Sequence, residues 1–176
     1  MTDKAIRDLF LQDSYQHLVH AVEKIEHCLG QLTVEQVWWR PTAEQNSIGN
    51  LVLHICGNVG QWILSGVGGE PDSRDRPLEF SERGPLEIVE LSDKLQFMLE
   101  DVNVFLASLT GQALEEERLL ESFQVQGFET TGLGAITHSV THFVGHMQEI
   151  ISLTRMQLGP DYQFNWQPSS EVEGAS

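Results

Sequence analysis

The chain has 176 residues, of which 26 are acidic and 10 are Lys or Arg, so its formal charge at pH 7 is −16. A chain of this length suits one domain with a substantial core. The acidic balance, without any cluster of Lys and Arg, argues against nucleic acids and membranes as partners, since both attract basic surfaces.

Helical period begins close to the N-terminus and extends over residues 3–32. The same N-terminal stretch contains no apolar signal core, so we expect a cytoplasmic protein. A turn over residues 38–41 follows, because its proline disfavours a helix at the preceding residue. A second helix should begin at Asn46 or Ser47, since both are good N-cap residues, and continue to about Ser65.

Long connections separate the later helices. Residues 70–84 form a loop of a length that is uncommon in small domains and often functional. A third helix is expected over residues 85–109 and a fourth over residues 134–158, where glycines and a proline end the helical pattern. Between them, residues 122–131 are expected to be extended around a glycine turn.

Four long helices with almost no strand predict an all-α fold, a four-helix bundle with long connections. We expect this domain to span residues 1–166. The small and polar residues 167–176 are expected to be a disordered tail. The most apolar stretch, residues 48–67, is interrupted by polar side chains and is not expected to span a membrane.

Three histidines on the fourth helix, His138, His142 and His146, are spaced by four residues. Residues four apart lie one turn above each other on one helical face, and imidazole pairs with this spacing recur in metal sites. The apolar residues around them predict a largely buried helix, where an imidazole needs a partner. Core histidines that bond to backbone or side chains are the alternative, and the spacing alone does not decide.

The second helix carries a polar stripe at steps of three and four residues, namely Ser47, Asn50, His54, Asn58 and Gln61. Buried polar side chains are costly on a bundle helix unless they line a site. A stripe that faced solvent without any charged residue would be unusual in so acidic a chain. We therefore expect His54 to complete a three-nitrogen metal site with His142 and His146.

Three protein ligands leave a coordination position for water or substrate, as in catalytic zinc sites. An ion in such a site lowers the pKa of a bound water or thiol. Asn58 and Glu149 each lie near a ligand on their own helix, so they are candidate catalytic residues, as acid–base groups or as partners of the ligands. Ordinary hydrogen bonding is the alternative for both. The sequence shows no glycine-rich phosphate loop and no nucleophilic triad.

Several stretches are specific in combination, namely Trp38–Pro41, Asn46–His54, Gly57–Asn58, Gln61–Ile63, Gly66–Gly69 with Asp72, Arg74, Asp75, Arg76, Glu79 and Phe80, and His138–His146 with Ile150. With these motifs the chain resembles the DinB-like (DinB/YfiT-like) superfamily over residues 5–165, and one uncharacterised subgroup in particular. The resemblance implies a bundle of up-down-down-up order. It also implies a divalent transition metal, zinc or nickel first, on His54, His142 and His146, and homodimers.

Members of this superfamily are similar to enzymes that use low-molecular-weight thiols such as bacillithiol or mycothiol, and others have been called metal-dependent hydrolases. Two positions depart from the familiar pattern. Glu149 stands where Gln is usual after the last histidine, and Thr141 stands where Glu is common before the second. A carboxylate at position 149 is expected either to join the site as a ligand or base, or to be solvated.

The leading hypothesis for function is a metal-dependent enzyme of the thiol S-transferase type, with a small-molecule substrate and a low-molecular-weight thiol as cofactor. A metal-dependent hydrolase is the first alternative. A bundle that binds a metal or small ligand without catalysis belongs to a different class and is the second. A bundle whose histidines bind nothing is the last.

Overall fold

The computed structural model describes residues 3–84, 86–110 and 118–164 of the chain. The tail expected to be disordered, residues 167–176, lies outside this part. Helices dominate the described residues, and strand is confined to one short hairpin. The long helical elements are α1 (Asp3–Leu29), α3 (Ile48–Val59) with its continuation η1 (Gly60–Val67), α5 (Ile88–Ser108) and α7 (Gly132–Leu158). The predicted all-α fold is confirmed.

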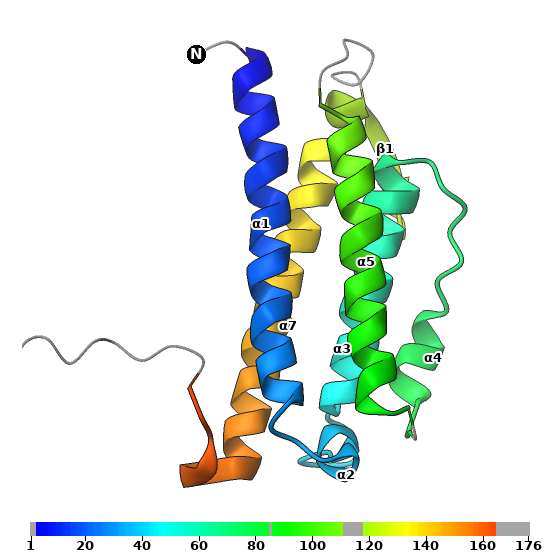
Figure 1. Ribbon diagram of the computed structural model, residues 1–176. Coiled ribbons are helices and arrows are strands. Elements are labelled where there is room, and N and C mark those ends of the chain that lie inside the picture. Colours follow the sequence, from blue (N-terminus) through cyan, green and yellow to red (C-terminus); the bar gives the residue numbers. More distant parts are fainter. Residues whose placement is uncertain (1–2, 85, 111–117, 165–176) are drawn as a thin grey trace, which may run out of the picture.

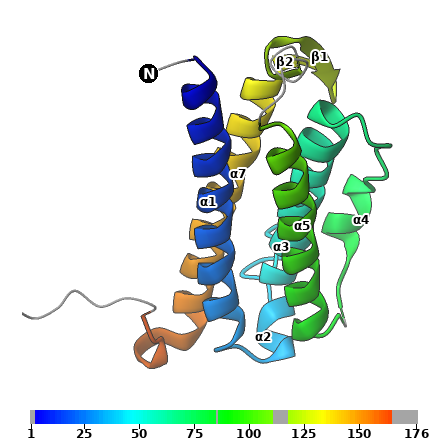
Figure 2. The same cartoon turned by 45° about the horizontal axis from the view of Figure 1, so that its top comes forward.

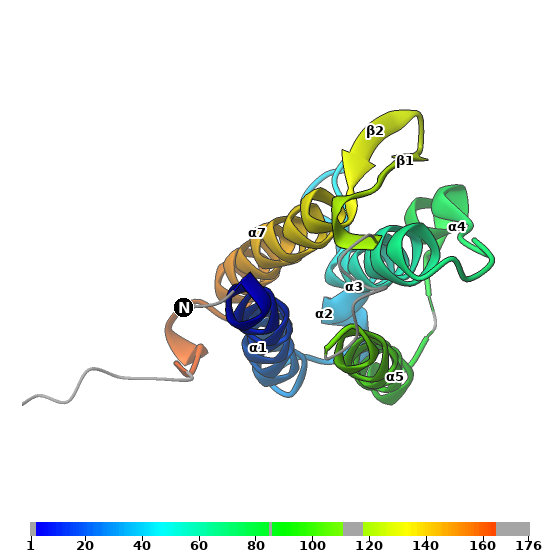
Figure 3. The ribbon, with the colours of Figure 1, turned by 90° about the horizontal axis from the view of Figure 1, so that it is seen from above.

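The four long helices form a bundle, which Figure 3 shows end-on with one helix at each corner. Helix α1 packs against α5 and α7, and α3 packs against the same two, so α1 and α3 lie diagonally opposite each other. Helices α1 and α7 run in one direction, and α3 and α5 run in the other (Figure 1). The order is therefore up-down-down-up, as the resemblance implied.

The core lies between the four helices and is built from their apolar faces. Each helix contributes side chains with no exposed surface, for example Ile25, Ile55, Leu95 and Phe143. Burying a side chain of this size stabilises the fold by about 1.5–3 kcal/mol. None of the described helices is apolar over a stretch long enough to cross a bilayer.

Short helices that the sequence did not predict occupy two of the connections. Helix α2 (Val34–Trp38) takes up part of the expected turn before α3 and is capped by Thr33. Helix α4 (Arg76–Ser81) lies within the expected loop over residues 70–84 and is capped by Asp75. Elements this short show no helical period in the sequence, which is why the prediction missed them.

The boundaries of the long helices differ from the prediction at several points, by two or three residues. The first helix ends at Leu29 instead of residue 32, and the third begins at Ile88 instead of residue 85, which is outside the described part. The second begins after its cap Ser47, one of the two caps predicted, but its final residues form the π-helix η1. The fourth ends before a glycine, as predicted.

Because α3 and α5 are parallel neighbours, the chain has to travel back along the bundle between them. Residues 68–84 make most of this return on the outer side of α3 and include α4 (Figures 1 and 2). The expected extended segment is an antiparallel hairpin of β1 (Ser122–Val125) and β2 (Phe128–Thr131), which packs against η1. Both connections therefore lie beside the helix that carries the polar stripe.

The π-helix η1 widens the end of that helix, since each amide bonds one residue further back than in an α-helix. Its second and third residues both reach neighbouring elements. Gln61 accepts a hydrogen bond of 2.9 Å from Arg74 in the return segment. Trp62 stacks on His138 of α7 at 4.0 Å between ring centroids. Two consecutive side chains of η1 thus contact the return segment and α7.

Candidate metal centre

Three histidines from two helices meet between α3 and α7. His54, His142 and His146 each offer one nitrogen, and these atoms lie within 4.8 Å of one another. His54 Nε2 is 2.9 Å from His142 Nε2, and the His146 ring centroid is 5.1 Å from that of His54. The structure brings together the three histidines that the sequence singled out, and this group could hold a divalent metal ion.

The other histidines near the bundle surface lie outside this group. His138 is exposed and sits in an aromatic stack, with Trp62 on one side and the His142 ring 5.5 Å away on the other. His17 and His20 are exposed on α1. The spacing of four thus brings His142 and His146 together as expected, while His138, the first histidine of the series, packs against the His142 ring.

A carboxylate from the return segment holds His54 in place. Glu79 Oε2 lies 2.9 Å from His54 Nδ1, and the Nδ1–H donates to it. This tautomer leaves the lone pair of Nε2 directed at the other two imidazoles. A carboxylate that accepts from the far nitrogen of a ligand histidine fixes the ring and makes it a stronger metal ligand.

Glu79 is itself held by a buried arginine. Arg74 donates to both carboxylate oxygens, from Nε to Oε1 at 2.6 Å and from Nη2 to Oε2 at 2.8 Å. Arg74 Nη2 also comes within 3.1 Å of His54 Nδ1, but that nitrogen already carries the proton given to Glu79, so the contact is not a hydrogen bond in this tautomer. A bidentate pair of this kind is geometrically specific.

The electrostatics of this pair favour an ionised carboxylate. Burial by itself would raise the pKa of Glu79, but the hydrogen bonds from Arg74 and His54 outweigh it and hold the pKa below its usual value. The side chains of Arg74 and Glu79 are 4% and 8% exposed. Glu79 therefore remains an acceptor for His54 at neutral pH.

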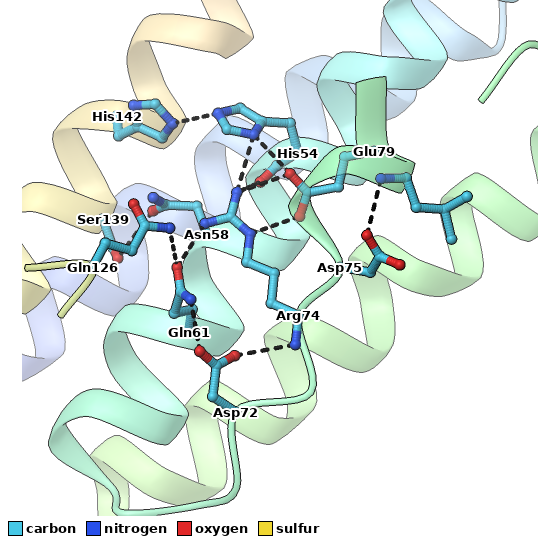
Figure 4. A network of polar contacts seen from close by, with 11 residues as sticks. His54, Asn58, Gln61, Asp72, Arg74, Asp75, Glu79, Gln126, Ser139 and His142 are labelled. Atoms are coloured by element: carbon cyan, nitrogen blue, oxygen red, sulfur yellow. Dashed lines mark hydrogen bonds and ion pairs between the residues drawn. The ribbon is translucent and has the colours of Figure 1, made fainter. Parts of the chain in front are cut away.

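The polar stripe of α3 and η1 anchors the return segment, as Figure 4 shows for part of the network. Asn50 donates from Nδ2 to the backbone carbonyls of Glu79 and Glu82 at 2.8 and 3.0 Å. Gln61 donates to Asp72 at 2.7 Å and accepts from Arg74. Ser47, Asn50, His54 and Asn58 are all buried. The prediction that this stripe faces inward holds for these four residues, while Gln61 is half-buried, and His54 and Asn58 line a cavity.

The two histidines that α7 contributes to the group differ in their surroundings. Burial, followed by the neighbouring His146 and His54, lowers the pKa of His142 to about 4, so this imidazole is neutral at physiological pH. Its Nε2–H donates to His54 Nε2 in the structure. His146 is more exposed and pairs through Nδ1 with Glu149 Oε2 at 2.9 Å. Neutral imidazoles are the form that binds metal ions.

The two candidate catalytic residues, Glu149 and Asn58, each form a hydrogen bond with one other side chain. Glu149 is 47% exposed and bonds to the nitrogen of His146, one turn before it on the helix. Asn58 is buried on α3, and its Oδ1 accepts from Ser139 Oγ of α7 at 3.2 Å. Glu149 thus stands to His146 as Glu79 stands to His54, but at the surface.

The metal centre opens onto a cavity of about 410 Å³. A volume of this order accommodates a small molecule. Its walls combine two of the ligands with polar, aromatic and cationic side chains, namely His54, His142, His138, Asn58, Trp62, Arg74, Arg76, Gln126, Phe128, Glu129 and Thr130. The return segment and the hairpin both contribute to these walls.

Sequence reasoning did not assign a role to Arg74 or Glu79. They lie 20 and 25 residues from His54 along the chain, and no periodicity links them to it. The signals that could have found them are the unusual length of the loop over residues 70–84 and the presence of both residues in the motifs that carry the family resemblance.

The donor set fits a divalent transition metal. Three imidazole nitrogens converge, one of them is oriented by a carboxylate on its far nitrogen, and the cavity leaves room for a further ligand. His54, His142 and His146 would hold such an ion.

Gly57 permits the ion pair to approach α3 closely. A Cβ at this position would collide with Glu79 Oε1 and would lie 3.0 Å from Arg74 Nε. We expect Gly57→Ala to displace the Glu79 carboxylate from His54, to weaken metal binding, and to lower the free energy of unfolding by about 1–3 kcal/mol. Denaturant titration and competition with a chromogenic chelator measure the two effects.

Gly60→Ala is the matched control for this variant. Gly60 lies three residues further along the same helix, and a Cβ there would meet nothing within 4 Å. Equal losses of stability and metal affinity in both variants would show that the close approach at Gly57 is not the cause.

A family model described as "Protein of unknown function (DUF1572)" matches residues 5–168 of the chain. No curated protein and no solved structure matches it. The matched residues include the three histidines of the metal centre and both members of the Arg74–Glu79 pair behind them.

Proposed function

The chain belongs to this family of proteins of unknown function, and from that premise we propose that it is an enzyme that depends on a divalent transition metal held by His54, His142 and His146. The observation that carries the proposal is the convergence of three imidazoles beside a small-molecule cavity, with a buried carboxylate fixing one of them. The order of the helices and this group of ligands support a place in the DinB-like superfamily that the sequence motifs resemble.

The proposed reaction is a transfer to or from a low-molecular-weight thiol. A divalent ion at this position lowers the pKa of a thiol that binds it, and so supplies a nucleophile at neutral pH. The residues of the chain orient the reactants. Asn58, held by Ser139 through Oδ1, is proposed to donate from its amide –NH2 to a ligand in the cavity. Glu149 is proposed to orient His146.

The cavity walls favour thiol transfer over hydrolysis. Water activation needs a group that takes up and returns a proton. Among the described residues that line the cavity, Glu129 is the sole carboxylate, and it lies on a strand of the hairpin. Glu79 is occupied by Arg74 and His54. The ion would lower the pKa of a bound thiol and of bound water alike, but hydrolysis also needs a proton for its leaving group, so the metal-dependent hydrolase remains the second candidate.

Cobalt substitution tests the proposed function. Protein loaded with Co²⁺ is titrated with 2-mercaptoethanol and, as a matched control, with ethylene glycol, which lacks the thiol. We expect the thiol, and not the diol, to produce a sulfur-to-cobalt charge-transfer band, and we expect His54→Ala to lose it. A cobalt protein whose spectrum no thiol changes, but which hydrolyses ester probes in a His54-dependent way, would favour the hydrolase instead.

A further inference from the structure

One cation in the cavity has no anionic partner. Arg76, the first residue of α4, lines the cavity, and no ion pair to it is formed within the part of the chain that the structure describes. Its guanidinium lies over the Phe80 ring, 5.0 Å from the centroid. The His54 ring is also close to this ring, 4.8 Å from Phe80 between centroids. One aromatic ring therefore contacts both the guanidinium and a candidate metal ligand.

Arg74, which also lines the cavity, differs from Arg76 in its partners. Arg74 gives its donors to Glu79 and Gln61, so it belongs to the scaffold of the centre. The N–H donors of the planar Arg76 guanidinium remain available to bind a ligand in the cavity. In a chain with 26 acidic residues and 10 basic ones, an arginine without a carboxylate beside a small-molecule cavity is suited to a carboxylate that the ligand brings.

The remaining walls offer flat apolar surface. Trp62 and His138 are stacked, with 28° between their planes, and both line the cavity. Phe128 of the hairpin lines it too and is 65% exposed, which is a large apolar surface to leave in water at the edge of a cavity. Aromatic walls favour ligands with a planar apolar body.

Glu129 is the one carboxylate that the hairpin contributes to the cavity walls, and its position on the strand leaves the aromatic character of the cavity intact. Side chains alternate along a strand, so Phe128 and Thr130 share one face of β2 and Glu129 occupies the other. The partners of the first two across the hairpin are Val125 and Phe123, whose side chains contact Gly66 of η1. The face with Phe128 and Thr130 is thus the one turned to the bundle.

We propose that the cavity binds a small carboxylate with a planar apolar body, such as an aromatic or unsaturated acid, and that Arg76 is the partner of its carboxylate group. This inference rests on the proposed function, because it places the substrate beside the three histidines, and it names the chemical class of that substrate. Arg76 fixes the charged end while Trp62, His138 and Phe128 contact the flat body.

Benzoate and benzamide test this assignment, since they share shape and differ in charge. The full chain is stripped of metal with a chelator, so that neither probe can ligate an ion, and each is titrated while amide NMR spectra are recorded. We expect benzoate to bind roughly fivefold more tightly than benzamide, as suits a partly exposed charged pair. The shifted resonances should come from the cavity residues, including Trp62 and Phe128.

Arg76→Gln should abolish the difference between the two probes. Arg155→Gln is the matched control, because Arg155 is also an exposed arginine over an aromatic ring, 5.9 Å from that of Tyr162, but lies outside the cavity. Equal affinities in the wild type, no binding of either probe, or a preference that survives Arg76→Gln or is lost in Arg155→Gln would each overturn the inference. Metal analysis of each preparation before the chelator is added keeps the two proposals separate, since a protein that binds metal but whose stripped form does not bind benzoate refutes only this one.

Discussion

Protein in which His142 and His146 are both replaced by alanine is expected to contain no stoichiometric metal, while the wild type contains close to one ion per chain. These residues supply two of the three nitrogens that lie within 4.8 Å of one another, so the variant retains His54 alone. A single imidazole does not hold a divalent ion against a chelating buffer. Elemental analysis of untagged protein is the measurement.

Thermal unfolding gives a second readout of the same change. A ligand at 100 times its dissociation constant stabilises the folded state by about 2.7 kcal/mol. For a chain of this size that corresponds to a rise in Tm of roughly 5–10 °C. We expect added zinc or nickel to raise the Tm of the wild type by this order and to leave the double variant unchanged.

The control is His17→Ala/His20→Ala, which removes two exposed histidines from α1. It should keep the metal and the rise in Tm. If the wild type contains no metal and none can be restored with zinc, nickel or manganese, the metalloenzyme proposal is wrong and the polar stripe is a structural network.

The second large effect is expected from Glu79→Ala. This variant removes the acceptor from His54 Nδ1 and leaves Arg74, 4% exposed, without its partner. Breaking a buried pair in this way costs about 3–5 kcal/mol of stability. Loss of a carboxylate behind a ligand histidine typically lowers metal affinity 10–100-fold, and we expect a decrease of about that size. Denaturant titration of metal-free protein and chelator competition measure the two quantities.

Arg74→Met/Glu79→Leu separates stability from metal binding. Apolar residues in place of a buried ion pair are often neutral, because neither charge then has to be desolvated. We expect the double variant to regain most of the stability lost in Glu79→Ala and to remain deficient in metal affinity. A double variant that stays as unstable as Glu79→Ala, or that binds metal like the wild type, would contradict the roles given to the pair.

Glu149→Ala is the surface counterpart of this experiment. Glu149 bonds to His146 as Glu79 bonds to His54, but it is 47% exposed. Its removal should cost less than about 1 kcal/mol of stability, since water screens the pair. Metal affinity should fall less than in Glu79→Ala.

Local sequence patterns were sufficient to predict the helices that carry the three histidines and the polar stripe beside them. The helical period alone places His142 and His146 one above the other, and the two candidate caps, Asn46 and Ser47, fixed the start of α3 to within one residue. The stripe from Ser47 to Gln61 could be assigned to the interior because uncharged polar residues in an acidic chain are poorly explained as a solvent-facing surface. These inferences need only residues within a few turns of one another.

The features that escaped prediction depend on contacts distant in sequence or on backbone detail. Glu79 reaches His54 only because α3 and α5 are parallel, which sends the intervening residues back along α3. Helix α4, which carries Glu79, is too short to show a period. The π-helix over Gly60–Val67 has the same hydrophobic pattern as an α-helix, so the sequence of this segment did not predict it.

The separation of the ligands along the chain has a consequence for folding. His54 and His142 are 88 residues apart, and the carboxylate that orients His54 comes from a third segment. A contact between such distant residues forms only after the entropy of closing the intervening loops has been lost. The centre is therefore absent from any intermediate in which α7 has not yet docked. Metal binding at this centre would therefore report on the completed bundle and not on its separate helices.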